Sequence, residues 1–258
     1  MKGDGILDGL MSLRMIGITG FSAYSTSFVQ MLCAICFLLY VFYKKNRKLE
    51  LNLRESLILI FIILSAVISA RSAFLGILVF LLILIKISTI KEFTKFISLS
   101  LLLIIIFIIT IISFVPTEFK EFFIRWITEL FVSGTNTGSF QTNVKMFKFS
   151  LADFSLLGDS RWFGDNNDYY MNIDVGWYRI LFSIGYIGLF FWILTILSIV
   201  GWKHILPPRL TSEKWIAALI LLYIFIMNFK GAILLDSFQS LFILLSINTA
   251  LTNKKLNL

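Results

Sequence analysis

Residues 97–115 read ISLSLLLIIIFIITIISFV, a run of nineteen residues without one charged side chain. An α-helix rises about 1.5 Å per residue, so this run would cover about 28 Å, close to the roughly 30 Å of a bilayer's hydrocarbon core. A segment in hydrocarbon must satisfy its own backbone polar groups, and a helix does so internally. The run therefore predicts a transmembrane helix.

The rest of the chain repeats this pattern at short intervals. Of its 258 residues, 58% are hydrophobic and only 15% are charged, and the mean hydropathy is +0.89, outside the range of a soluble globular domain. We predict an all-α integral membrane protein that forms a single domain, residues 1–258, with about seven transmembrane helices. The predicted spans are 22–43, 55–70, 73–88, 97–115, 177–202, 215–230 and 232–250.

The basic residues predict the orientation of these spans. The net charge of +8 could suggest nucleic acid, but lysines and arginines stand in short clusters between apolar runs, at 44–54, 86–95, 203–214 and 254–255. Such clusters favour the cytoplasmic side of a membrane, so we expect no nucleic-acid partner. The resulting path places the C-terminus in the cytoplasm and the long loop 116–175, with eight acidic and five basic residues, outside. Segments 118–131 and 142–154 of that loop predict short helices, the first of them amphipathic.

The same path leaves residues 1–21 outside, although no signal peptide precedes them. An odd number of spans with an external start predicts that upstream helices are missing, through truncation, an internal start or a disrupted reading frame. The alternative is that residues 6–18 lie in the membrane interface as an amphipathic helix.

Cys33 and Cys36 form a CxxC inside an apolar run, and His204 is the one histidine of the chain. A redox or zinc site needs accessible cysteines in a polar setting and further ligands. We therefore interpret these cysteines as buried packing residues, His204 as a loop residue, and predict no metal site and no cofactor.

Several arginines gather on the predicted external face. Arg71 and Arg179 are the most informative, because they stand at or just within the ends of spans, where an ionisable side chain is a functional candidate. A guanidinium can donate two parallel hydrogen bonds to the oxygens of a phosphate group. The structural alternatives are a snorkelling anchor for Arg71 and, for Arg179, an ion pair with Asp174 or Glu129. Arg14 and Arg161 complete the set of candidates.

Carboxylates and aromatic rings alternate at the end of the loop. Asp168 and Asp174 stand among Trp162, Tyr169 and Tyr178. Aromatic rings stack on the apolar faces of sugars and carboxylates accept protons from hydroxyl groups, so this mixture suits a carbohydrate substrate. An aromatic belt at the membrane interface would use the same tryptophans and tyrosines.

The order of these features resembles the O-antigen polymerase and O-antigen ligase superfamily. The resemblance rests on Ser69-Ala70-Arg71-Ser72 opening a span, on a large external loop, and on Asp168-Tyr169-Tyr170 followed by Asp174-Val175-Gly176-Trp177-Tyr178-Arg179 entering the next span. Arg14-Met15-Ile16-Gly17 is similar to the family's RxxG stretch. Complete members have more spans than this chain.

The resemblance implies a GT-C-like glycosyltransferase of the bacterial inner membrane, active at the periplasmic face without nucleotide sugar or bound metal. Its substrate would be an undecaprenyl-diphosphate-linked oligosaccharide, within membrane lipid, and a chain-length regulator protein is an expected partner. By position, Arg71 and Arg14 would bind the diphosphate. The residues that would face the acceptor and the reacting sugar are Arg161, Asp168, Tyr169, Asp174, Tyr178 and Arg179.

The resemblance favours the polymerase branch, because the ligase branch carries a histidine where this chain has Asp168-Tyr169-Tyr170. An O-antigen ligase and a flippase or transporter of lipid-linked sugars stay as alternatives. A transporter would need charged or broken helices, whereas the predicted spans read as nearly unbroken.

Overall fold

The computed structural model describes residues 23–45, 48–114, 144–164, 170–201 and 211–252, and within these ranges the chain is helical and contains no strand. The prediction of an all-α protein is therefore confirmed for the described residues. The predicted helix 118–131 lies outside them. The helices are α2 (Ala23–Lys44), α3 (Leu53–Ser69), α4 (Ala73–Ile87), α5 (Ile90–Phe114), α8 (Gly176–Val200), α9 (Ser212–Met227), α10 (Ile233–Asp236) and α11 (Phe238–Thr252).

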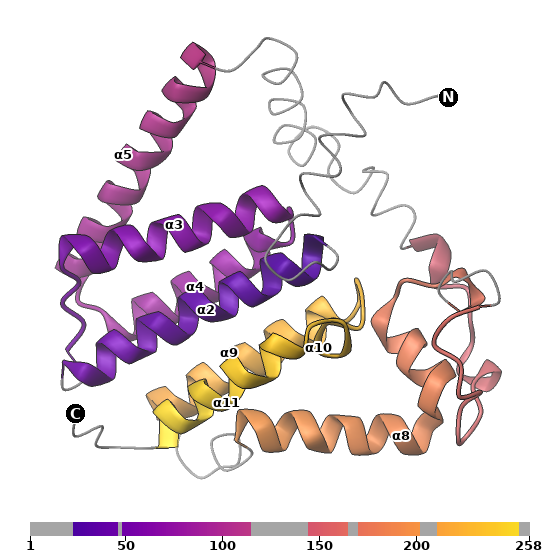
Figure 1. The fold of residues 1–258 in the computed structure, drawn as a ribbon. Helices are drawn as coiled ribbons and strands as arrows, with labels where there is room; N and C mark the ends of the chain where they lie inside the picture. Colours follow the sequence, from indigo (N-terminus) through magenta and orange to yellow (C-terminus); the bar gives the residue numbers. More distant parts are fainter. Residues whose placement is uncertain (1–22, 46–47, 115–143, 165–169, 202–210, 253–258) are drawn as a thin grey trace.

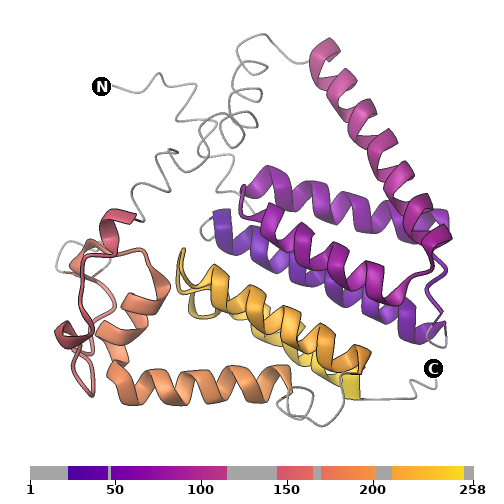
Figure 2. The ribbon, with the colours of Figure 1, turned by 180° about the vertical axis from the view of Figure 1, so that it is seen from behind.

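Helix α2 is the centre of the packing. It contacts α3, α4 and α11 along its length, and its residues Phe28, Met31 and Leu32 are fully buried. The ring of Phe28 lies 5.0 Å from that of Tyr223 on α9. The charge-poor helices thus form one bundle with a dry core, seen from opposite sides in Figures 1 and 2.

Local sequence signals explain several helix ends. Asn52 and Glu55 form a reciprocal capping box that starts α3, with the Asn52 Oδ1 accepting from the Glu55 amide at 2.8 Å. The hydroxyl of Thr211 accepts from the Lys214 amide and caps α9. Gly201, with φ +93°, ends α8 in the left-handed region that glycine adopts freely.

Within the described residues, three helices are long and apolar enough to cross a membrane: α2, α5 and α8. Helices α4 and α11 are apolar but have 15 residues each, a rise of about 22 Å. All seven predicted spans overlap helices, and three of them meet the length and composition of a membrane span.

Helix α5 leaves the bundle. It runs away from α3 and α4 in Figures 1 and 2, and the apolar side chains of its second half, such as Leu101, Ile105 and Ile109, are more than half exposed. Because exposure of such a long apolar surface to water is unfavourable, this helix is suited to lipid or to a partner helix.

Helix α8 contains a break that the prediction of a continuous span over 177–202 did not include. Gly185 has φ +65° and ψ −168°, a conformation that only glycine adopts without strain. The freed backbone groups bond to the loop before the helix: the Asp159 and Ser160 amides donate to the Phe182 and Ser183 carbonyls. Figure 1 shows the two halves of α8 meeting at a sharp bend.

The predicted last span, 232–250, is also divided. Helix α10 ends at Asp236 and α11 begins at Phe238, with Ser237 between them in a non-helical conformation. The prediction of one unbroken helix there is corrected, because the Ser237 backbone, with φ −136° and ψ 85°, leaves the helical region next to Asp236, whose carboxylate bonds to Tyr24 and Arg179.

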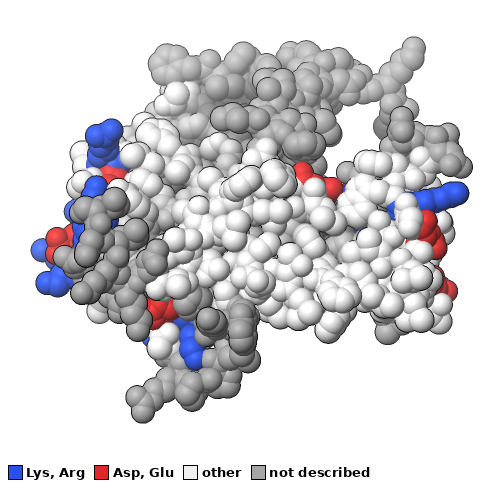
Figure 3. Space-filling view, turned by 60° about the horizontal axis from the view of Figure 1, so that its bottom comes forward, with Lys and Arg blue, Asp and Glu red and all other residues white. Residues whose placement is uncertain are grey.

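Charged side chains gather toward opposite ends of the molecule. Figure 3 shows lysines, arginines and acids at the two sides of the view and an almost charge-free surface between them. The side near the ends of α2 and α4 carries Lys45, Lys48, Lys86, Lys91 and Lys95. The opposite side carries the loop 144–164 and the first turns of α8.

A buried arginine cluster as the candidate functional site

Arg179 is the centre of the candidate site. It lies in the second turn of α8, and only 3% of its surface is exposed. Its Nη1 is 3.0 Å from the Oδ2 of Asp236, and its guanidinium carbon stands 4.2 Å from the centre of the Trp162 ring. A guanidinium stacked on an aromatic face and paired with a carboxylate is held in one orientation.

Asp236 joins three helices at this point. Its Oδ2 accepts from the Tyr24 hydroxyl at 2.9 Å as well as from Arg179. Tyr24 lies in the first turn of α2, Arg179 in α8 and Asp236 at the end of α10. The aspartate therefore connects residues that stand 212 and 57 positions away in the sequence.

Two glycines permit this approach. A Cβ atom on Gly176, the first residue of α8, would meet the Ala232 amide at 2.5 Å and the backbone of Gly231 more closely still. A Cβ atom on Gly231 would meet the ring and hydroxyl of Tyr24. Because backbone packs directly on backbone and on ring, the start of α8, the turn before α10 and the start of α2 come together.

Asp174 lies just before α8, beside the arginine. Burial is the main effect on its carboxyl group and raises its pKa above the usual aspartate range; Arg179 and Lys230 oppose this shift, and the negative charge of Asp236 adds to it. The Oδ1 of Asp174 is buried and accepts no hydrogen bond from the described residues. A carboxylate in this state is suited to accept a proton.

A small cavity adjoins the cluster. It has a volume of about 330 Å³, and its lining residues come from α8, α10 and the loop before α8: Trp162, Ile180, Ser183, Ile184, Trp192 and Leu235. The indole Nε1 of Trp192 is buried and donates to no described residue. The cavity is apolar, with a tryptophan that also covers Arg179.

Tyr178 belongs to a neighbouring aromatic cluster. Its ring lies 5.3 Å from that of Phe154 and 5.5 Å from that of Phe147, and its hydroxyl donates to the Phe149 carbonyl at 3.4 Å. The structure thus places Tyr178 in the contact that holds residues 147–154 against α8, one residue from Arg179.

Two further predicted residues, Arg161 and Arg71, lie within the described part of the chain. Arg161 is exposed, and its guanidinium carbon lies 5.9 Å from the centre of the Tyr170 ring. Arg71 occupies the turn between α3 and α4, at the end of the bundle where α2 begins. Arg14, Asp168 and Tyr169 lie outside the described residues.

Sequence reasoning missed Asp236, Tyr24 and Lys230 as members of the cluster. A signal for Asp236 exists, because it is the one acidic residue between positions 214 and 258, inside a predicted span, where a carboxylate needs a partner. Tyr24 carries no such signal, since tyrosines at span ends are common.

Among the described residues, no three His, Cys, Asp or Glu side chains lie close enough together to hold a metal ion. No protein-family model, curated protein or solved structure matches this chain. Fold and site together define a class: an α-helical bundle of membrane-protein character with a buried arginine–aspartate pair at one end.

Proposed function

We propose that this protein is a glycosyltransferase of the bacterial inner membrane that polymerises undecaprenyl-diphosphate-linked oligosaccharides into a surface polysaccharide. The finer assignments, seven spans and a GT-C-like fold, belong to the same proposal. In this arrangement the loop 116–175 faces the periplasm, the C-terminus faces the cytoplasm, and a chain-length regulator is the expected protein partner.

One observation carries the proposal: a fixed, buried arginine stands beside a half-buried aspartate with a raised pKa, at the end of a long apolar helix. A membrane enzyme that uses a lipid diphosphate needs positive charge for the leaving group and a base for the attacking hydroxyl. Trp162 supplies the aromatic surface that sugar rings favour.

The reaction requires few groups from the protein. A sugar hydroxyl of one lipid-linked unit attacks the anomeric carbon of the growing glycan, a new carbon–oxygen bond forms, and the bond to the diphosphate oxygen breaks. Asp174 accepts the hydroxyl proton, with Asp168 as the second candidate. Arg179 provides a fixed positive charge beside Asp174. Arg71 and Arg14 bind the departing diphosphate.

Transport of the same lipid-linked sugars is the second candidate, and the break at Gly185 favours it. Interrupted helices inside long apolar segments are typical of transporters, because their free backbone groups bind substrate or ions. Here the amides and carbonyls around Gly185 bond to residues 155–160 instead. Transport therefore ranks below polymerisation, and an O-antigen ligase is the third candidate.

The test is deletion of the gene in its own host, followed by complementation with variants and gel analysis of surface polysaccharide. Loss of a polymerase leaves single repeat units at the surface, loss of a flippase leaves none, and loss of a ligase leaves polymer on its lipid carrier. We expect single repeat units for the deletion.

Among the variants, Asp174→Asn, Arg179→Ala and Arg71→Ala should fail to restore the polymer ladder. Asp159→Asn is the matched control, because the exposed side chain of this loop aspartate accepts only one hydrogen bond from the described residues, from the Tyr170 hydroxyl at 3.3 Å. Membrane levels of each variant are measured by immunoblot. A normal ladder from Asp174→Asn and Arg71→Ala at normal protein levels would refute the proposed roles.

A further inference from the structure

The opposite end of the bundle contains a hollow of about 760 Å³. Its walls come from the connection between α2 and α3, the end of α4 and the start of α5. Five lysines and two glutamates are among the residues that line it: Lys45, Lys48, Lys86, Lys91, Lys95, Glu50 and Glu92.

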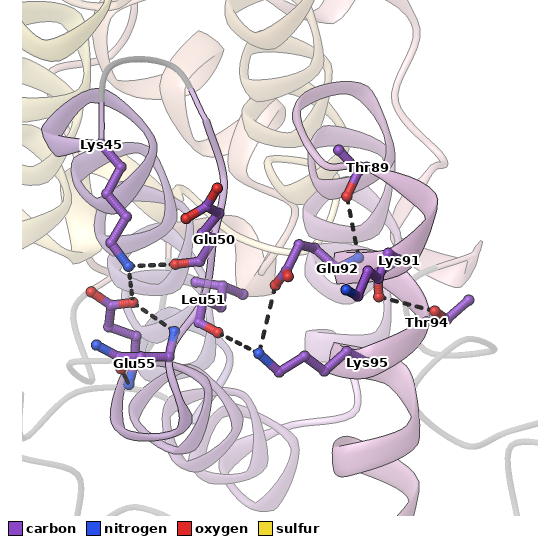
Figure 4. Close-up of polar contacts among 10 residues, drawn as sticks. Lys45, Glu50, Leu51, Glu55, Thr89, Lys91, Glu92, Thr94 and Lys95 are labelled. Carbon is purple, nitrogen blue, oxygen red and sulfur yellow. Dashed lines mark hydrogen bonds and ion pairs between the residues drawn. The ribbon is translucent and has the colours of Figure 1, made fainter.

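Positive charge is in excess around this hollow. The Lys45 Nζ is 2.7 Å from the Glu55 carboxylate, and Lys95 stands 3.9 Å from Glu92 while it donates to the Leu51 carbonyl. Figure 4 shows these two groups facing each other. By contrast, Lys48, Lys86 and Lys91 are exposed and form no ion pair with a described residue.

Neutral donors complete the lining. The Ser88 hydroxyl, between α4 and α5, is buried and has no hydrogen-bond partner among the described residues. Ser88 and Thr89 precede the first turn of α5, where the helix dipole favours an anion. A phosphate group would supply acceptors for the buried Ser88 hydroxyl and for three lysines that have no ion-pair partner among the described residues.

An apolar groove meets this hollow at Lys86. The groove has a volume of about 600 Å³ and is lined by Leu82, Ile85, Lys86, Thr211 and Trp215. Leu82, Ile85 and Trp215 are all exposed, and tryptophan favours the membrane interface. A positive hollow that continues into an apolar groove is better suited to an amphipathic anion than to a small soluble anion such as inorganic phosphate.

We propose that this end of the protein binds an anionic phospholipid, with the phosphate among Lys48, Lys86, Lys91 and Ser88 and an acyl chain along Leu82, Ile85 and Trp215. The inference rests on the membrane insertion given under the proposed function. It does not depend on the polymerase reaction. Basic hollows between helices at the cytoplasmic side suit lipid headgroups of this kind.

The test is native mass spectrometry of the purified full chain in detergent, titrated separately with phosphatidylglycerol, phosphatidylcholine and inorganic phosphate. We expect phosphatidylglycerol to bind at least about tenfold more tightly than phosphatidylcholine, and inorganic phosphate to bind more weakly than phosphatidylglycerol. Equal binding of the two lipids would overturn the proposal. Inorganic phosphate binding as tightly as phosphatidylglycerol would overturn the lipid assignment.

Variants locate the site. Lys86→Ala with Lys91→Ala should weaken phosphatidylglycerol binding about tenfold or more, and Trp215→Ala should weaken the lipid without affecting inorganic phosphate. The matched control is Lys44→Ala with Arg54→Ala, which removes the same charge from exposed positions at the same end that do not line the hollow. Equal losses in both double variants would overturn the site, whatever the polysaccharide phenotype.

Discussion

At the scale of single residues, the pair formed by Arg179 and Asp236 is the feature with the largest electrostatic consequence. The side chain of Arg179 is 1% exposed and that of Asp236 is 15% exposed. A buried ion pair contributes little net stability when it is complete, because desolvation offsets attraction, but loss of one partner leaves an uncompensated buried charge.

We expect Asp236→Ala to lower the free energy of unfolding by about 3 kcal/mol, because Arg179 would lose its carboxylate partner. The double variant Arg179→Leu with Asp236→Leu should recover most of this loss, since apolar side chains need no charge partner. Thermal unfolding of the detergent-purified protein measures both. A double variant as unstable as the single one would contradict this account of the pair.

The pKa of Asp174 predicts a pH dependence. Because burial raises that pKa in the folded state, the protonated carboxyl is favoured there, and its contribution to stability is present below the ordinary aspartate pKa of about 4. This contribution is lost as pH rises through the raised value. We expect Asp174→Asn to be more stable than wild type at pH 7 and to lack this decline.

The measurement is the melting temperature of both proteins from about pH 4 to pH 8. Asp159→Asn serves as the control, because Asp159 is exposed and its substitution should leave the profile unchanged. Parallel profiles for wild type and Asp174→Asn would show that Arg179 and Lys230 cancel the effect of burial.

At the scale of helices, the break in α8 is set by one residue pair. Gly158, with φ +77°, and Gly185 face each other, and a Cβ atom on Gly158 would meet the Gly185 amide nitrogen at 2.5 Å. At the bend, backbone groups of residues 155–160 form hydrogen bonds with the backbone of α8 that the helix would otherwise make within itself. These bonds hold the bend in a defined conformation.

We expect Gly185→Ala to destabilise the protein by about 2 kcal/mol or more, because its φ and ψ are costly for a residue with a Cβ atom. The control is Thr195→Ala in the same helix, since Thr195 is exposed and bonds only to the Phe191 carbonyl. Thermal unfolding compares them. A Gly185→Ala protein as stable as the control would indicate that α8 straightens at no cost.

At the scale of the whole molecule, charge separates the two ends. The hollow with five lysines and the Arg179 cluster lie at opposite ends of the bundle, and the surface between them in Figure 3 carries few charges. Such a distribution agrees with the proposed topology, in which one end lies on each side of a bilayer and the lysine end faces the cytoplasm.

Cysteine labelling tests this topology. In a background with Cys33→Ala and Cys36→Ala, we expect Leu157→Cys to react with a membrane-impermeant maleimide in intact cells whose outer membrane is permeabilised. Lys91→Cys should react only after the inner membrane is opened. Both positions are exposed, so accessibility in the folded protein does not separate them. Reaction of Lys91→Cys in intact cells would reverse or abolish the proposed orientation.

The sequence by itself determined the helical class and the positions of the main apolar helices, and it singled out Arg179 and Asp174 as candidate site residues. These properties follow from the local sequence. Apolar runs predict helices, and a charged side chain at the end of such a run costs solvation energy, so it is a candidate for binding or catalysis. The break at Gly185 was missed, because a glycine inside an apolar run carries no mark of its φ angle.

Only the tertiary structure decided which residues meet. Arg179 pairs with Asp236, a partner that the sequence did not suggest, because Gly176 and Gly231 let two backbones approach until the carboxylate reaches the guanidinium. The lysine hollow also depends on the tertiary structure, because its walls come from the α2–α3 connection, the end of α4 and the start of α5. Contacts between distant segments depend on how closely backbones pack, which no local pattern of residues expresses.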